Sequence, residues 1–178
     1  MLDQVIISRS QLIYTNEEIN MAIENLASKL NKKYRNNKVL LLPILTGAIP
    51  FVGILIPKLD FTIEVNYFHV SRYVNNKGGN AINVTHQPSE KIIQNQNILV
   101  VDDILDEGIT MSLIYELLIP MKPQSISNVV LFEKKLKQKK TINADFVGLE
   151  VPNSYVFGFG LDFNGLGRNI PDLYAFNE

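Results

Sequence analysis

Apolar runs typical of buried strands alternate with helical patterns along most of the chain. Residues 39–45 and 98–101 are continuous apolar runs, and each precedes a short turn and an apolar-rich run of helical length. Near the N-terminus, Thr15 and Glu18 form a capping box ahead of apolar positions at helical spacing, which predicts a helix to about Lys32. This alternation predicts an α/β fold, a parallel sheet flanked by helices.

The other segments follow the pattern less regularly. Pro43 lies inside the first apolar run, and its missing N–H is unfavourable for a central strand. Residues 61–70 alternate between polar and apolar and predict a second strand, while residues 126–132 predict a further one. Residues 71–90 are mostly polar, which favours either a mobile lid or a loose hairpin.

The stretch 98–110 carries the strongest functional signal. Its apolar strand is followed directly by four acids, then by Gly108 and Thr110 at the start of a predicted helix, residues 111–118. The carboxyl ends of parallel strands are where open α/β sheets bind ligands, and the free N–H groups of a helix start suit a phosphate. A simple helix cap or tight turn is the alternative, but four crowded acids favour a nearby cation or polyhydroxyl ligand.

Three further segments could contribute to such a site. Thr46 and Gly47 follow the first apolar run, where an anion site and a turn chosen for tightness are equally good interpretations. Lys134 begins a basic run that is otherwise typical of a solvated surface, yet it stands at the end of a predicted strand. Tyr155 and Phe157 share one face of an extended segment, which fits either a ligand site or an aromatic core strand.

Composition narrows the class of protein. The 178 residues predict one domain, and 17 Lys plus Arg against 18 Asp plus Glu leave a net charge of −1. No excess of positive charge indicates a nucleic-acid or membrane partner. The chain has no cysteine, which excludes disulfides, thiolate metal sites and cysteine nucleophiles. Without a signal-peptide pattern or a long apolar run, we expect a soluble, cytoplasmic protein.

Residues 100–110 resemble the phosphoribosyl-diphosphate (PRPP) binding motif of type I phosphoribosyltransferases, with two acids after a strand and then Asp-x-Gly-x-Thr. These residues are most similar to those of the purine-salvage branch, the hypoxanthine-guanine phosphoribosyltransferases. The resemblance implies that Asp102 and Asp103 meet the ribose hydroxyls. It also implies substrate contacts, including those to the 5′-phosphate, along the following loop: Ile104, Asp106, Glu107, Gly108, Ile109 and Thr110. Glu107 and Ile109 depart from the common Thr and Lys, and Glu107 is expected to point away from the phosphate.

The resemblance extends from residue 45 to residue 168. It implies a diphosphate loop at residues 45–47, where Thr46 and Gly47 contact substrate and Thr46 stands in a place often held by Lys or Arg. A flexible catalytic loop would follow, with Arg72-Tyr73 in place of the usual Ser-Tyr. The implied partners of the other substrate groups are Lys134 for the purine 6-oxo group, Tyr155 stacked on the base, Val156 reading its edge, Asp162 on magnesium and Arg168 on diphosphate. The two histidines, His69 and His86, receive no role.

The implied reaction is transfer of the phosphoribosyl group from PRPP to hypoxanthine or guanine, giving IMP or GMP plus diphosphate. Mg²⁺ is the implied cofactor, held by Asp162, Asp102 and Asp103. The resemblance also implies that Asp106 is the general base and that Arg168 and Tyr73 take part in catalysis. The fold is expected to be a type I phosphoribosyltransferase-like sheet with a small hood from residues 1–14 and 150–178, assembled as a homodimer or homotetramer. Two alternatives stay open: a regulator that binds PRPP without catalysis, and an enzyme for another base, xanthine or orotate.

Overall fold

The two apolar runs become neighbouring central strands, β2 (Lys38–Leu45) and β6 (Asn97–Leu105), in the computed structural model, which describes residues 4–74 and 80–176. The other strands of this sheet are β3 (Thr62–Val65), β4 (Phe68–Val74), β5 (Asn80–His86), β7 (Ser125–Lys134) and β8 (Phe146–Val151). Their order is β5-β4-β2-β6-β7-β8, with β3 paired to the first part of β2. Pairing is parallel except between β4 and β5, so the sheet is mostly parallel, as expected.

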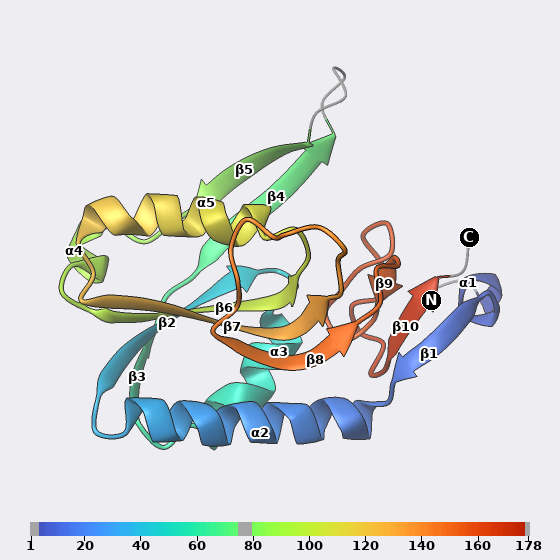
Figure 1. Cartoon of the computed structure of the whole chain (residues 1–178), viewed down its shortest axis with the longest axis horizontal. Coiled ribbons are helices and arrows are strands. Elements are labelled where there is room, and N and C mark those ends of the chain that lie inside the picture. The colour runs from blue at the N-terminus through green and yellow to red at the C-terminus, as the bar shows by residue number, and fades with distance from the viewer. Residues whose placement is uncertain (1–3, 75–79, 177–178) are drawn as a thin grey trace.

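Helices cover both faces of this sheet (Figure 1). One face carries α2 (Asn16–Tyr34), α3 (Ile49–Leu55) and the short η1 (Ile56–Lys58); the other carries α4 (Glu90–Ile93), α5 (Ile109–Leu118) and η2 (Ile119–Met121). Strand side chains alternate between the two cores: Leu99 and Val101 pack with α2 and α3, whereas Ile98 and Val100 pack with α5. Burial on both faces explains why these strands are continuous apolar runs.

A second, three-stranded sheet lies beyond the carboxyl ends of β6, β7 and β8 (Figure 1). It contains β1 (Ser10–Tyr14), β10 (Leu173–Phe176) and β9 (Val156–Phe157), in the order β1-β10-β9, and α1 (Gln4–Ser8) precedes β1. Both pairings are antiparallel. The early and late parts of the chain therefore meet beside the edge of the main sheet where its parallel strands end.

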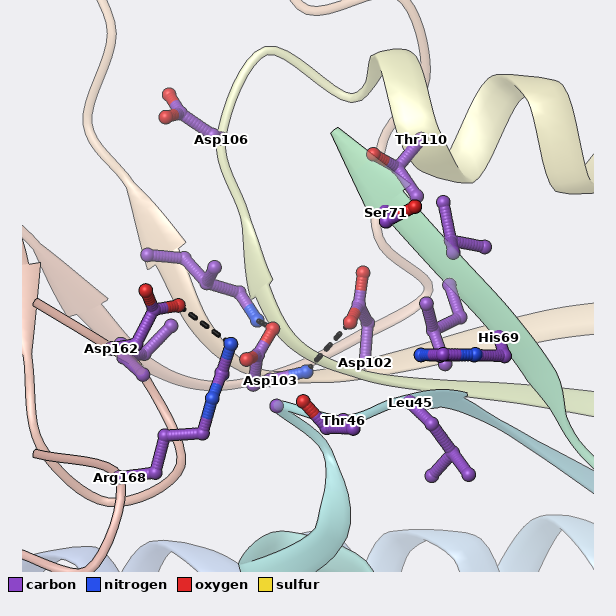
Figure 2. Close-up of a pocket in the computed structure, with 15 residues that line it drawn as sticks. Leu45, Thr46, His69, Ser71, Asp102, Asp103, Asp106, Thr110, Asp162 and Arg168 are labelled. Carbon is purple, nitrogen blue, oxygen red and sulfur yellow. Dashed lines mark hydrogen bonds and ion pairs between the residues drawn. The ribbon is translucent and has the colours of Figure 1, made fainter. Parts of the chain in front are cut away.

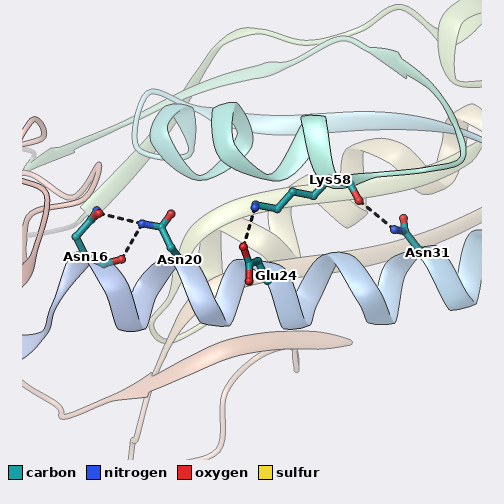
Figure 3. Close-up of polar contacts among 5 residues, drawn as sticks. All are labelled: Asn16, Asn20, Glu24, Asn31 and Lys58. Atoms are coloured by element: carbon teal, nitrogen blue, oxygen red, sulfur yellow. Dashed lines mark hydrogen bonds and ion pairs between the residues drawn. The ribbon is translucent and has the colours of Figure 1, made fainter.

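Polar contacts fix α2 at its start and along its length. The predicted capping box is confirmed: the Thr15 backbone N–H donates to Glu18 Oε2 at 2.8 Å, and the Thr15 hydroxyl accepts from the Glu18 N–H at 3.3 Å. Further along, Asn31 Nδ2 donates to the Lys58 carbonyl at 3.0 Å, and Lys58 Nζ pairs with Glu24 at 3.0 Å (Figure 3). These contacts hold η1, and with it the end of α3, against α2.

The segment predicted as one strand over residues 61–70 is two strands, β3 and β4, so that prediction is wrong. Asn66 and Tyr67 separate the two strands, because β2 pairs with β3 through Leu41 and with β4 only from Ile44 onward. Pro43 falls between these two partners, where its missing N–H interrupts no ladder on that flank. The described parts of residues 71–90 include an antiparallel β4–β5 hairpin, followed by the short α4.

Within the described residues, no helix combines the length and apolarity needed to cross a membrane.

Candidate active site

A pocket of about 540 Å³ opens where the carboxyl ends of β2 and β6 and the first half of β4 face the loop between β9 and β10. Most residues to which the sequence gave a role line it: Thr46, Gly47, Asp102, Asp103, Ile104, Asp106, Thr110, Asp162 and Arg168. The others that line it are Ile44, Leu45, His69, Val70, Ser71 and Leu161. Figure 2 shows the labelled side chains gathered from the end of β2, from β4, from β6 with the start of α5, and from the loop before β10. This is the edge at which a parallel α/β sheet binds ligands.

The acid pair lies inside β6 rather than after it, which corrects the expected strand end at Val101. β6 continues to Leu105 because its last residues still pair with β7. The Asp103 N–H donates to Asp102 Oδ1 at 3.0 Å, and the Ile104 N–H donates to Asp103 Oδ1 at 2.7 Å. Strand geometry therefore fixes both carboxylates at the floor of the pocket, where 7% of Asp102 and 9% of Asp103 is exposed.

The surroundings of Asp103 perturb its carboxyl group. Burial raises the pKa of its carboxyl group, and hydrogen bonds from its neighbours and the charge of Arg168 oppose that rise. A side chain at position 47 would clash with it, because a Cβ built on Gly47 would fall 1.6 Å from Asp103 Oδ2. Glycine at position 47 thus lets the start of α3 approach the acid pair. The peptide bond that leads into this turn, Leu45–Thr46, is cis.

The loop from Asp106 to Thr110 turns from β6 into α5. Gly108 occupies the N-cap position with φ +85°, a left-handed conformation that favours glycine. The Glu107 side chain faces Gln138, whose Nε2 donates to Glu107 Oε1 at 3.4 Å. The Glu107 carbonyl accepts hydrogen bonds from the Thr141 N–H at 3.0 Å and its hydroxyl at 3.1 Å. Glu107, Gly108 and Ile109 are not among the described pocket-lining residues.

Lys134 contacts Asp106, which the sequence did not foresee. Its Nζ lies 2.8 Å from Asp106 Oδ2, and both side chains are partly buried. The contact follows from sheet register: β6 and β7 are neighbours, and Leu105 pairs with Glu133. Lys135, one residue on, instead pairs with Glu150 on the surface. Position at the end of a parallel strand therefore distinguishes Lys134 from the rest of the basic run.

The opposite wall of the pocket comes from the loop before β10. Arg168 Nη2 lies 2.6 Å from Asp162 Oδ1, and the Gly165 N–H donates to Asp162 Oδ2 at 2.8 Å. The Tyr155 hydroxyl donates to the Asp162 carbonyl at 3.1 Å. Tyr155 and Phe157 both meet Phe163 edge-on, which confirms that they share one face. Val156, which points away from that face, is buried within β9.

The acids of the pocket fit a magnesium ion that arrives with part of its coordination shell. Among the described residues, no three His, Cys, Asp or Glu side chains come close enough to hold a metal ion together. Asp162 Oδ1 contacts Arg168 and Asp162 Oδ2 accepts from the Gly165 N–H, and each carboxylate oxygen has a second lone pair that can bind another ligand. Mg²⁺ commonly takes one or two carboxylates and completes its shell with water and substrate phosphates. The donor set is therefore compatible with Mg²⁺ bound jointly with an anionic substrate.

The sequence missed two polar residues of this pocket, His69 and Ser71. Both lie on β4, whose His69 pairs with Leu45 at the end of β2. The sequence put His69 near the end of the strand predicted over residues 61–70 but gave it no role, because a lone histidine there is more often an ordinary polar residue. Tyr73 lies on the same strand, but its side chain is outside the part of the chain that the structure describes, and so are residues 75–79 of the expected lid.

Comparison with known proteins decides the family. The model of the phosphoribosyl transferase domain matches residues 10–164. The chain belongs to this family. It is 34% identical to the hypoxanthine-guanine phosphoribosyltransferase of Bacillus subtilis over 90% of this chain and 89% of that protein. It is 33% identical to the enzyme of that name from Aquifex aeolicus, over 94% of this chain and 95% of that protein.

Solved structures of the phosphoribosyl transferase family share the fold. A hypoxanthine phosphoribosyltransferase from Staphylococcus aureus matches with a TM-score of 0.86 and 28% identity, covering 99% of this chain and 97% of that one. The Trypanosoma cruzi enzyme, solved in complex with the product IMP, matches with a TM-score of 0.81 and 26% identity over 95% and 91% of the two chains. The α/β fold expected from the sequence is therefore confirmed.

Proposed function

We propose that the protein is a purine-salvage enzyme that transfers the 5-phosphoribosyl group of PRPP to hypoxanthine or guanine. The products are IMP or GMP and diphosphate. The observation that carries this proposal is the convergence on one pocket of the acid pair of β6, the Asp106–Thr110 loop, and the Asp162–Arg168 pair. The names of the curated relatives, which match along nearly their whole length, support the same reaction.

The phosphoribosyl part of PRPP would bind along β6 and the start of α5. The backbone N–H groups of Gly108, Ile109 and Thr110, with the Thr110 hydroxyl, would hold the 5′-phosphate. Asp102 and Asp103 would accept hydrogen bonds from the ribose hydroxyls, a role that suits two carboxylates fixed at the pocket floor. Glu107 is directed toward Gln138 and adds no charge beside the phosphate.

The purine would bind between the end of β7 and the loop beside β9. Lys134 would donate to the 6-oxo group, Tyr155 would stack on the ring, and the backbone of Val156 would read its edge. Asp106 would accept the proton that the purine loses when its nitrogen attacks the ribose. The ion pair between Lys134 and Asp106 supports this assignment, because it places the proposed donor and the proposed base side by side.

The diphosphate would leave along the opposite wall. Breaking the C1–O bond builds positive charge on the ribose and negative charge on the departing oxygens. Arg168 and the backbone of Thr46 and Gly47 would bind those oxygens. Mg²⁺ bound with PRPP would neutralise part of the same charge, with Asp162 and the acid pair as its candidate carboxylates.

Two parts of the chain would close over the bound substrates. The β4–β5 hairpin, which carries Tyr73, would act as a lid that excludes water from the reactive ribose. The three-stranded sheet, with residues 1–14 and 150–178, would form a hood over the base.

A panel of nucleobases tests the proposed function. The purified protein is mixed with PRPP, Mg²⁺ and one base at a time, and diphosphate release is measured. We expect turnover with hypoxanthine or guanine and none with adenine or orotate. Release only with xanthine or orotate would reassign the base. PRPP binding without release for any base would favour the non-catalytic regulator.

A further inference from the structure

We propose that β4 supplies part of the diphosphate site, with His69 Nε2 and the Ser71 hydroxyl donating hydrogen bonds to the diphosphate oxygens of PRPP. This inference rests on the proposed function, since it names residues that would hold the leaving group of that reaction. Neither residue received a role from the sequence.

The position of His69 follows from strand pairing. β4 runs parallel to the end of β2, with Phe68 opposite Ile44 and His69 opposite Leu45. His69 therefore stands beside the turn that begins at Thr46. Side chains two residues apart on a strand share a face, so Ser71 lies on the same side of β4. Figure 2 shows both side chains on the β4 wall, with the His69 ring extending toward the side of the pocket where Asp102 lies.

The His69 ring is held in place by the neighbouring strand. Thr85 Oγ1 on β5 lies 2.7 Å from His69 Nδ1, and it also lies 3.3 Å from the His69 carbonyl oxygen. The Thr85 hydroxyl has one proton, which it can give to Nδ1 or to the His69 carbonyl oxygen. An anionic oxygen at Nε2 selects the form in which Nε2 carries the ring proton and Nδ1 accepts from Thr85, and the contact with Thr85 fixes the direction of the ring.

Ser71 presents a polar atom that the protein itself does not satisfy. Its Oγ is buried and has no hydrogen-bond partner among the residues that the structure describes. An unpaired buried hydroxyl is costly, and such groups in native proteins usually meet a ligand or water. An anionic oxygen at this wall of the pocket would satisfy Ser71 and His69 together.

The charge of the pocket explains why extra donors are needed there. Among the described residues that line it, Asp102, Asp103, Asp106 and Asp162 carry negative charge, and Arg168 is the one arginine or lysine. Arg168 is itself engaged by Asp162 and by the carbonyl of Gly160. Neutral N–H and O–H donors on β4 would bind the diphosphate oxygens that face away from Arg168.

Ligand affinities of point variants test this assignment. The dissociation constants of PRPP, free diphosphate and GMP are measured with Mg²⁺ for the wild type, His69→Leu and His69→Gln. We expect His69→Leu to weaken the binding of PRPP and of diphosphate by roughly 10- to 100-fold, the range for losing a hydrogen bond to a charged group. GMP lacks the diphosphate, so its affinity should stay within about twofold. His69→Gln keeps an N–H donor at similar reach and should recover part of the loss.

Control variants separate a contact from a general disturbance of β4. His86 is the register partner of His69 on β5, so His86→Leu is the matched control and should leave PRPP affinity unchanged. Thr85→Val should weaken PRPP binding by a few-fold, and Thr85→Ser, which keeps the hydroxyl, should bind PRPP as the wild type does. Equal PRPP affinities in the wild type and His69→Leu would overturn the inference, as would an equal loss for PRPP and GMP. If the wild type does not bind PRPP at all, the proposed function itself fails.

Discussion

At the scale of single residues, the pair formed by Lys134 and Asp106 has the clearest consequence. The two side chains are in contact at 2.8 Å, so a purine bound as proposed would replace this ion pair with its own 6-oxo group and its own acidic N–H.

Replacing Asp106 with asparagine should remove the proposed general base and keep the size and shape of the side chain. We expect Asp106→Asn to fold normally, because the side chain is partly exposed, and to bind PRPP with nearly unchanged affinity. Turnover should fall by roughly 10²- to 10⁴-fold, the range for losing general acid–base catalysis. Steady-state kinetics together with PRPP titration measure both quantities. Wild-type turnover in this variant would exclude Asp106 from the mechanism.

Replacing Lys134 tests base recognition. Lys134→Ala leaves the 6-oxo oxygen of the bound purine without a donor, which should weaken hypoxanthine binding by roughly 10- to 100-fold. Adenine carries a donor at that position, so the gap between hypoxanthine and adenine should narrow. Lys135→Ala is the matched control, because Lys135 pairs with Glu150 on the surface. Equal effects of the two changes would show that the basic run is only a solvated surface.

At the scale of elements, β7 and β8 are joined by a reciprocal contact. The Asn128 N–H donates to Asp145 Oδ2 at 2.9 Å, and the Asp145 N–H donates to Asn128 Oδ1 at 3.0 Å. Asn128 Nδ2 also donates to the Tyr115 hydroxyl at 3.0 Å, which ties α5 to the same point. Only 1% of Asn128 is exposed, whereas Asp145, the residue before β8, is exposed, so the junction reaches from the interior to the surface.

Removing the Asn128 side chain should destabilise the protein without altering the pocket. Asn128→Ala leaves the Asp145 N–H without its acceptor inside the fold, and we expect a loss of about 1–3 kcal/mol in the free energy of unfolding. Chemical denaturation measures this loss, and PRPP affinity should be unchanged. Ser125→Ala, on the exposed start of β7, is the control and should change stability by less than about 0.5 kcal/mol. A loss as small as that of the control would mean that the junction is not stabilising.

At the scale of the whole molecule, the β4–β5 hairpin is the proposed moving part. With PRPP and a non-reactive purine analogue bound, the amides of residues 71–86 should exchange with solvent more slowly than in the free protein. Tyr73→Ala should lower turnover more than it weakens purine binding, because a lid acts after binding. Hydrogen exchange read by mass spectrometry measures the first effect. Protection confined to the Asp106–Thr110 loop would place the lid elsewhere.

The sequence predicted the α/β class and the capping box from local patterns, whereas most of the pocket lining was named through the resemblance to phosphoribosyltransferases. It did not predict that residues 61–70 divide between two strands, since both halves alternate in the same way and the partner changes along β2. His69 lay near the end of that predicted strand and was given no role, and its place in the pocket depends on the pairing of β4 with the end of β2. The Lys134–Asp106 contact depends on the register of β6 and β7, which sequence periodicity does not specify.

The four carboxylates and one guanidinium of the lining also have a kinetic consequence. Such a pocket repels a polyanion at long range, so inert salt should speed the capture of PRPP instead of slowing it, because screening weakens that repulsion. Stopped-flow association rates at fixed Mg²⁺ and increasing KCl measure this dependence. A rate that falls with salt would show that positive charge elsewhere on the surface outweighs the acids. If the rate rises, the protein captures PRPP faster at physiological ionic strength than in a dilute buffer.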